Sequence, residues 1–126
     1  MSRTLAVVAV FALVGVVAYQ MLTGGASEPP DAVVAAIEDG APVVDVRTAE
    51  EYASGHVAGA IHANVFDDGF ERRMAALDRS EPVYLYCATG ARSGRAARIL
   101  EDMGFERVVN AGGLGELAEA GATVER

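Results

Sequence analysis

The 126-residue chain is predicted to form one α/β domain with a mainly parallel central sheet flanked by helices, preceded by a hydrophobic segment. Short β-branched apolar runs alternate with helix-like segments, as in domains built around a parallel sheet. The runs lack polar alternation, which is typical of strands that helices cover on both faces. The length suits a single core of about 100–150 residues. The chain therefore divides into an N-terminal segment (1–26), a linker (27–30) and the domain (31–126).

The N-terminal segment is predicted to be a signal peptide or a transmembrane anchor. Arg3 precedes an apolar stretch over residues 5–22. Its length falls between the about 7–15 residues of a signal-peptide core and the about 20 of a membrane span. Cleavage after Ala26 would suit signal peptidase because small residues precede that bond, so both alternatives stay open. Either one places the domain outside the cytoplasm, on the periplasmic or extracytoplasmic face.

The first part of the domain contains a helix, a strand and a second helix. Residues 31–40 follow two prolines and end at a glycine, as a short helix does. Residues 42–46, "PVVDV", have the pattern of a buried strand. Residues 48–55 are expected to form a helix, because Thr48 is followed three residues later by Glu51 in a capping box.

The middle of the domain leads to its clearest strand. Residues 56–65 predict a turn and a short strand, and residues 68–78 predict another helix. Residues 81–87, "EPVYLYC", combine β-branched and aromatic residues in a run typical of a strand.

The last part contains an amphipathic helix, a strand and a final helix. Residues 93–104 have the spacing of a helix with one apolar face. Its core side is expected to be Ala96, Ala97, Leu100 and Met103, and its outer side Arg95, Arg98 and Asp102. Residues 106–110 predict the fourth strand, and residues 113–121 predict the last helix.

The only cysteine, Cys87, is predicted to end a strand and to begin the loop "ATGAR". Ligands of such sheets bind at the carboxyl ends of strands. The N–H groups at the start of the next helix favour an anion and lower the pKa of a thiol placed there. Gly90 lets the loop curl so that its N–H groups converge. An isolated cysteine is often a buried structural residue, but this setting favours a nucleophile.

The cysteine and histidine content limits the other chemistry. Structural cysteines of exported proteins come in pairs, and a lone cysteine allows neither an intramolecular disulfide nor a resolving thiol. The two histidines, His56 and His62, have no metal-ligand spacing with it. No metal and no cofactor are therefore expected.

The charge distribution indicates small anions as ligands. The formal net charge is −8, and all basic residues are arginines. This balance argues against nucleic acid as a partner, because phosphate backbones are bound by excess cations. The stretch from Val83 to Leu100 nevertheless has no acidic residue and contains Arg92, Arg95 and Arg98. This local charge of +3 marks where an anionic substrate could be held.

Three segments resemble the rhodanese sulfurtransferase family. The stretch "CATGARS" is similar to its six-residue active-site loop, C-x-x-G-x-R, with the serine that usually follows. Upstream, "VVDVRTAEEYASGHVAGAIHANV" resembles the family's D-V-R, E-(F/Y) and G-H-(I/V)-x-G-A signature, and "MGFERVVNAGGLGEL" resembles its glycine-rich segment. The resemblance covers about residues 30–120. One departure is Leu117, where many members have tryptophan; this alters core packing and no catalytic position.

The resemblance implies a rhodanese-like fold and a ping-pong transfer of sulfane sulfur. Cys87 would attack thiosulfate or a similar small anionic donor, and its persulfide would pass sulfur to cyanide or a thiol. Arg92 would hold the donor or orient the loop. Asp45, Arg47 and His56 match family positions, with structural or supporting roles favoured. The implied substrate-binding residues are Ala88, Thr89, Gly90, Ala91 and Arg92.

Two other functions are alternatives to sulfur transfer. Related phosphatases have one more residue in the loop, so the four residues between Cys87 and Arg92 disfavour a phosphatase. A non-catalytic or sulfur-carrier interaction module at the membrane is the stronger alternative, because one fold can serve several functions. The intact loop with its cysteine favours the enzyme.

Overall fold

The structure, a computed structural model, describes residues 24–126. The apolar stretch 5–22, for which an anchor or signal peptide is predicted, lies outside the described residues. Within the described part, no helix combines the length and the hydrophobicity needed to cross a membrane.

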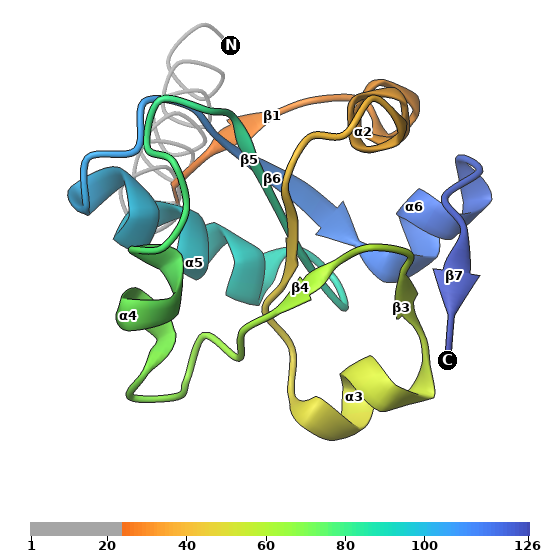
Figure 1. The fold of residues 1–126 in the computed structure, drawn as a ribbon. Coiled ribbons are helices and arrows are strands. Elements are labelled where there is room, and N and C mark those ends of the chain that lie inside the picture. The colour runs from red at the N-terminus through yellow and green to blue at the C-terminus, as the bar shows by residue number, and fades with distance from the viewer. Residues whose placement is uncertain (1–23) are drawn as a thin grey trace, which may run out of the picture.

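A five-stranded parallel sheet forms the centre of the domain (Figure 1). The strand order is β1-β6-β5-β2-β4. The strands are β1 (Ala26–Ser27), β2 (Val43–Asp45), β4 (Ile61–His62), β5 (Val83–Cys87) and β6 (Val108–Gly113). A separate antiparallel pair joins β3 (His56–Val57) to β7 (Val124–Glu125). The predicted α/β architecture with a mainly parallel sheet is confirmed.

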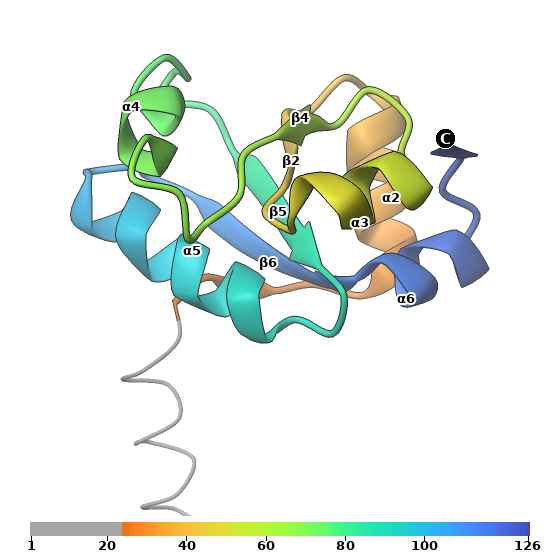
Figure 2. The ribbon, with the colours of Figure 1, turned by 90° about the horizontal axis from the view of Figure 1, so that it is seen from below.

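Helices cover both faces of the sheet (Figure 2). One face carries α4 (Phe70–Met74) and α5 (Ala91–Asp102), and the other carries α2 (Pro30–Glu38) and α6 (Leu114–Glu119). The short α3 (Ala49–Ser54) follows the carboxyl end of β2. The two-sided cover explains why the strands lack a polar face.

Strand β5 alternates between the two halves of the core. Val83, Leu85 and Cys87 belong to the apolar cluster beneath α4 and α5. Tyr84 and Tyr86 belong to the cluster on the α2 and α6 side. This two-residue alternation places Cys87 on the face that α5 covers.

The predicted elements are found with changed boundaries. Helix α5 begins at Ala91 rather than at residue 93, because Gly90 takes the N-cap position with a left-handed φ of 103°. Strand β6 extends to Gly113, three residues beyond the predicted end. The buried side chains of α5 include Ala96, Ala97 and Leu100, as predicted. Met103, the fourth residue of the predicted core face, is the C-cap residue and is only partly buried against the same cluster.

Residues 56–65 form two short strands, β3 and β4, where one was predicted, and two further short strands were not predicted. Strands β1 and β7 have two residues each, which is too short for a periodic pattern. Because of β1, residues 27–30 are only partly a linker: Ser27 pairs with Asn110, and Pro30 begins α2. Leu117, at the position where the family resemblance implies tryptophan, is fully buried on the α2 and α6 side.

The predicted capping box at the start of α3 is confirmed. The Glu51 N–H donates to Thr48 Oγ1 at 3.2 Å, and the Thr48 N–H donates to Glu51 Oε1 at 3.3 Å. These two bonds satisfy N–H groups that the first turn of a helix otherwise leaves unpaired.

A buried carboxylate joins the carboxyl ends of β2 and β5. Asp45 is 0% exposed and accepts hydrogen bonds from the Arg47 guanidinium, the shortest at 2.7 Å, and from Tyr86 Oη at 2.8 Å. Arg47 also donates to the Gly55 carbonyl at 2.6 Å, and Tyr86 Oη accepts the Val57 N–H at 2.9 Å. Burial raises the pKa of Tyr86, so its hydroxyl remains a donor. The network ties three strands together.

The variant Asp45→Asn tests this network. The amide would leave the buried guanidinium of Arg47 without a counter-charge, so unfolding should become easier by about 3–5 kcal/mol. Urea denaturation followed by circular dichroism measures the change. The matched control is Asp102→Asn, whose side chain is 72% exposed in a 3.6 Å surface pair and should leave the midpoint unchanged. Equal midpoints for both variants would contradict the proposed importance of the buried pair.

Candidate active site

Cys87 lies at the end of β5, directly before the loop that leads into α5. The residue is only 1% exposed. Its Sγ accepts the Gly90 N–H at 2.9 Å and lies 3.5 Å from the Ser93 hydroxyl. The thiol is therefore held in a nest of donors at the N-terminus of a 12-residue helix, as the sequence predicts.

The surroundings of Cys87 favour its charged form. Burial raises the pKa of the thiol, but hydrogen bonds from the Ser93 hydroxyl and from the N–H groups of Ser93, Thr89 and Gly90 outweigh it. The net shift of the pKa is downward from the ordinary value. The thiolate is the nucleophilic form of cysteine, so the site increases its reactive fraction near neutral pH.

The active-site loop packs closely on the carboxyl end of β6. A side chain at Gly113 would collide with the carbonyl oxygen of Ala88. A side chain at Gly90 would meet the Gly112 backbone at 3.5 Å and would also oppose a φ of 103°. Backbone packs on backbone here, which fixes the directions of the loop N–H groups.

Ser93 and Asn110 support the loop around Cys87, and no sequence pattern predicts a role for either residue. Ser93 Oγ lies 2.7 Å from Asn110 Oδ1, 3.1 Å from the Gly90 carbonyl and 3.5 Å from Cys87 Sγ. A hydroxyl has one proton and donates to one of these acceptors at a time. Asn110 Nδ2 also donates to the Gly90 carbonyl at 3.0 Å. The signal for Asn110 was a polar residue on the strand beside β5, near its carboxyl end.

Arg92 is held by Glu51, a residue that the sequence predicts only as part of a capping box. Its two terminal nitrogens lie 2.6 and 2.9 Å from the two carboxylate oxygens of Glu51. The hydrogen bonds from Arg92 lower the pKa of Glu51 to about 2, and those to Glu51 raise the pKa of Arg92. The predicted role of Arg92 in holding a donor stays a prediction, and this pair supports its predicted role in orienting the loop.

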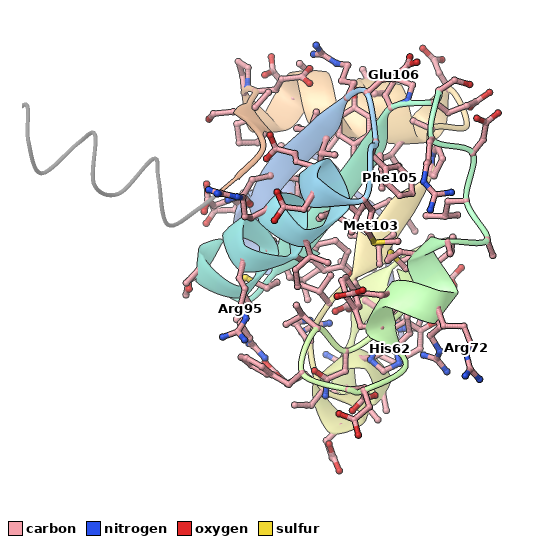
Figure 3. The ribbon with its side chains drawn as sticks, turned by 90° about the vertical axis from the view of Figure 1, so that its left-hand side faces the viewer. His62, Arg72, Arg95, Met103, Phe105 and Glu106 are labelled. Atoms are coloured by element: carbon pink, nitrogen blue, oxygen red, sulfur yellow. The ribbon has the colours of Figure 1, made fainter. Side chains whose placement is uncertain are left out.

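The three arginines near the loop do not gather around the thiol. The Arg95 guanidinium extends outward from α5 and lies 5.2 Å from the centroid of the exposed Phe66 ring (Figure 3). Arg98 Nε lies 3.6 Å from Asp102 Oδ1. The charge of +3 in residues 83–100 is therefore partly neutralised by neighbouring carboxylates and partly directed away from the thiol.

Asp45, Arg47 and His56 contact the framework of the domain. The first two form the buried network beneath the carboxyl ends of β2 and β5. The His56 ring stacks on Tyr52 with centroids 3.8 Å apart, and its Nδ1 lies 2.9 Å from the Tyr52 carbonyl oxygen. These contacts favour the predicted supporting roles. In residues 24–126, no three His, Cys, Asp or Glu side chains are arranged to hold a metal ion.

Comparison with known proteins identifies the family of the domain. The rhodanese-like domain family matches residues 29–120. Thiosulfate sulfurtransferase PspE of Escherichia coli is 40% identical over 75 residues, 60% of this chain and 72% of PspE. Thiosulfate sulfurtransferase GlpE of Pseudomonas fluorescens is 41% identical over 89 residues, 71% of this chain and 80% of GlpE. The solution NMR structure of the rhodanese-like domain of Anabaena protein Alr3790 has a TM-score of 0.68 at 27% identity, covering 80% of this chain and 77% of that one. The chain belongs to the rhodanese-like domain family, as its cysteine loop predicts.

Proposed function

We propose that the protein transfers sulfane sulfur from thiosulfate or a similar small anionic donor to cyanide or a thiol through a persulfide on Cys87. The observation that carries the proposal is the donor nest around Cys87 Sγ, with the Gly90 N–H at 2.9 Å and the Ser93 hydroxyl at 3.5 Å. The downward shift of the Cys87 pKa suits a nucleophile. The sulfurtransferase relatives support the reaction class.

In the first step, the Cys87 thiolate attacks the outer sulfur of thiosulfate. A new sulfur–sulfur bond forms on Cys87, the sulfur–sulfur bond of thiosulfate breaks, and its electron pair leaves with sulfite. The persulfide carries the negative charge on its outer sulfur. The N–H groups of Thr89, Gly90 and Ser93 are directed at Cys87 Sγ, and such fixed donors stabilise developing negative charge on the neighbouring outer sulfur without reorganisation.

In the second step, the acceptor attacks the outer sulfur of the persulfide. The bond to Cys87 breaks, and its electron pair restores the thiolate. Cyanide leaves as thiocyanate, and a thiolate leaves as a persulfide. Neither step consumes an oxidant or reductant. The exposed loop residues Ala88, Thr89 and Ala91 are small, which leaves room for the acceptor over the nest.

We also propose that the domain is exported and that its N-terminal segment stays attached as an anchor. The Gly24 N–H donates to the Gly94 carbonyl at 2.9 Å, and the Gly25 N–H donates to Glu101 Oε1 at 2.6 Å. Ala26 belongs to β1. Cleavage after Ala26 would divide β1 and release residues bound to α5, so these contacts favour retention over cleavage.

Membrane fractionation and intact-mass measurement test the anchor. The full chain should sediment with membranes and keep the mass of residues 1–126. The control variant Val10→Arg/Val14→Arg places two charges in the apolar stretch and should leave the membrane fraction. A mature protein that begins at Ser27 would show cleavage and overturn the proposal.

The variant Cys87→Ser tests the covalent step. The wild-type protein incubated with thiosulfate should gain one sulfur, about 32 Da, on the Cys87 peptide, as covalent catalysis requires. Cys87→Ser should gain none and should lose thiosulfate:cyanide activity. Activity near the wild-type level in this variant would contradict the mechanism. Sulfur loading without turnover in the wild type would identify a carrier instead of an enzyme.

The variant Ser93→Ala tests the stabilisation of the thiolate. Because the Ser93 hydroxyl lowers the pKa of Cys87, its removal should raise that pKa and reduce the thiolate fraction at neutral pH. The pH profile of iodoacetamide alkylation should move to higher pH, and alkylation at pH 7 should slow several-fold. Ser80→Ala, a change in an exposed turn, is the control. An unchanged profile in Ser93→Ala would show that backbone donors alone set the pKa.

A further inference from the structure

We propose that Glu51 determines which sulfur donors the site prefers: by pairing with Arg92, it disfavours doubly charged donors relative to singly charged ones. The inference rests on the proposed sulfur transfer. It concerns a carboxylate outside the active-site loop, 41 residues before Arg92 in the chain.

Both terminal nitrogens of Arg92 bind the Glu51 carboxylate. They lie 2.6 and 2.9 Å from the two oxygens of Glu51, which is a bidentate arrangement. The planar guanidinium binds a carboxylate bidentately through one pair of parallel N–H groups. A donor anion that used this same pair of N–H groups would have to displace Glu51.

Glu51 is itself fixed in place. Its Oε1 also accepts the Thr48 N–H at 3.3 Å and lies 3.1 Å from Thr48 Oγ1 in the capping box of α3. The carboxylate is thus held from two sides, by the start of α3 and by Arg92. Its pKa of about 2 keeps it charged at every pH where the thiolate reacts.

Arg92 is the arginine nearest to Cys87 in the sequence. Because it is paired with Glu51, it is not a free positive charge. Glu51 and Arg92 remain 34% and 25% exposed. Arg92 also interacts electrostatically with Cys87, so a donor that approaches the thiol meets this pair. Arg47 is paired with the buried Asp45, and Arg95 lies over Phe66. Hydrogen-bond donors of the loop then provide the main attraction for the sulfur donor at the nest. Each further negative charge on the sulfur donor is repelled by the Glu51 carboxylate.

Two donors of different charge give the same persulfide on Cys87. Thiosulfate has charge −2 and leaves as sulfite; methanethiosulfonate has charge −1 and leaves as methanesulfinate. In both cases the thiolate attacks the terminal sulfur, and the bond to the oxidised sulfur breaks with its electron pair. The ratio of their KM values therefore reports the charge preference separately from the chemistry of the thiolate.

The experiment compares the wild type with Glu51→Gln, Arg92→Gln and the double variant, with folding checked by circular dichroism. Glutamine at position 51 keeps the capping-box hydrogen bonds while removing the charge. The Glu51→Gln change should lower the KM of thiosulfate relative to that of methanethiosulfonate by about twofold to fivefold, the range of a partly exposed charge interaction. Arg92→Gln should shift the ratio the other way, and the double variant should return it to the wild-type ratio. All shifts should shrink at high salt.

Three outcomes would overturn the inference. If Glu51→Gln raises the KM of both donors as Arg92→Gln does, Glu51 only positions Arg92. If the double variant has the same ratio of KM values as Arg92→Gln, Arg92 contacts the sulfur donor directly, and the charge of Glu51 does not set the preference. If Glu51→Gln fails to fold, an unchanged ratio in Arg92→Gln is sufficient to reject the inference. A wild-type protein that takes sulfur from neither donor would instead reject the proposed function.

Discussion

A negatively charged sulfur removed from water needs hydrogen-bond donors, and the site is built around this requirement. Burial of a charge is costly unless fixed donors replace the lost water. The loop between β5 and α5 provides them, because Gly90 adopts a left-handed conformation and turns its N–H to Cys87 Sγ at 2.9 Å. The absence of a side chain at Gly113 lets the loop approach β6. The glycines are therefore as necessary to the thiolate as the donors themselves.

One short segment holds both ends of this loop. Asp45, at the end of β2, binds the hydroxyl of Tyr86, the residue directly before Cys87. Glu51, in the first turn of α3, binds Arg92, which lies in the first turn of α5. Seven residues of sequence thus provide one buried and one half-exposed carboxylate that clamp the loop before and after the nucleophile. The segment positions the site although it contributes no donor to the sulfur.

Features that depend on a few neighbouring residues could be predicted from the sequence. Features that depend on contacts between residues far apart in the chain could not. The alternation in residues 83–87, the capping box of Thr48 and the cysteine loop are each readable within a few residues, and the structure contains all three. The ion pair of Arg92 joins residues far apart in the chain, so counting charges near Cys87 overstated the free positive charge. The two-residue strand β1 is equally invisible, because its existence depends on β6 alone.

The separation of the two clamps also orders events in folding. Both join residues 41 positions apart, so neither can close until β2, β5 and α5 have come together. Contacts of such separation form late, because the entropy of closing the intervening chain must be overcome first. Until then Cys87 has the chemistry of an ordinary thiol. Enhanced reactivity of this thiol is therefore a property of the finished tertiary structure, and its appearance would time the final stage of folding.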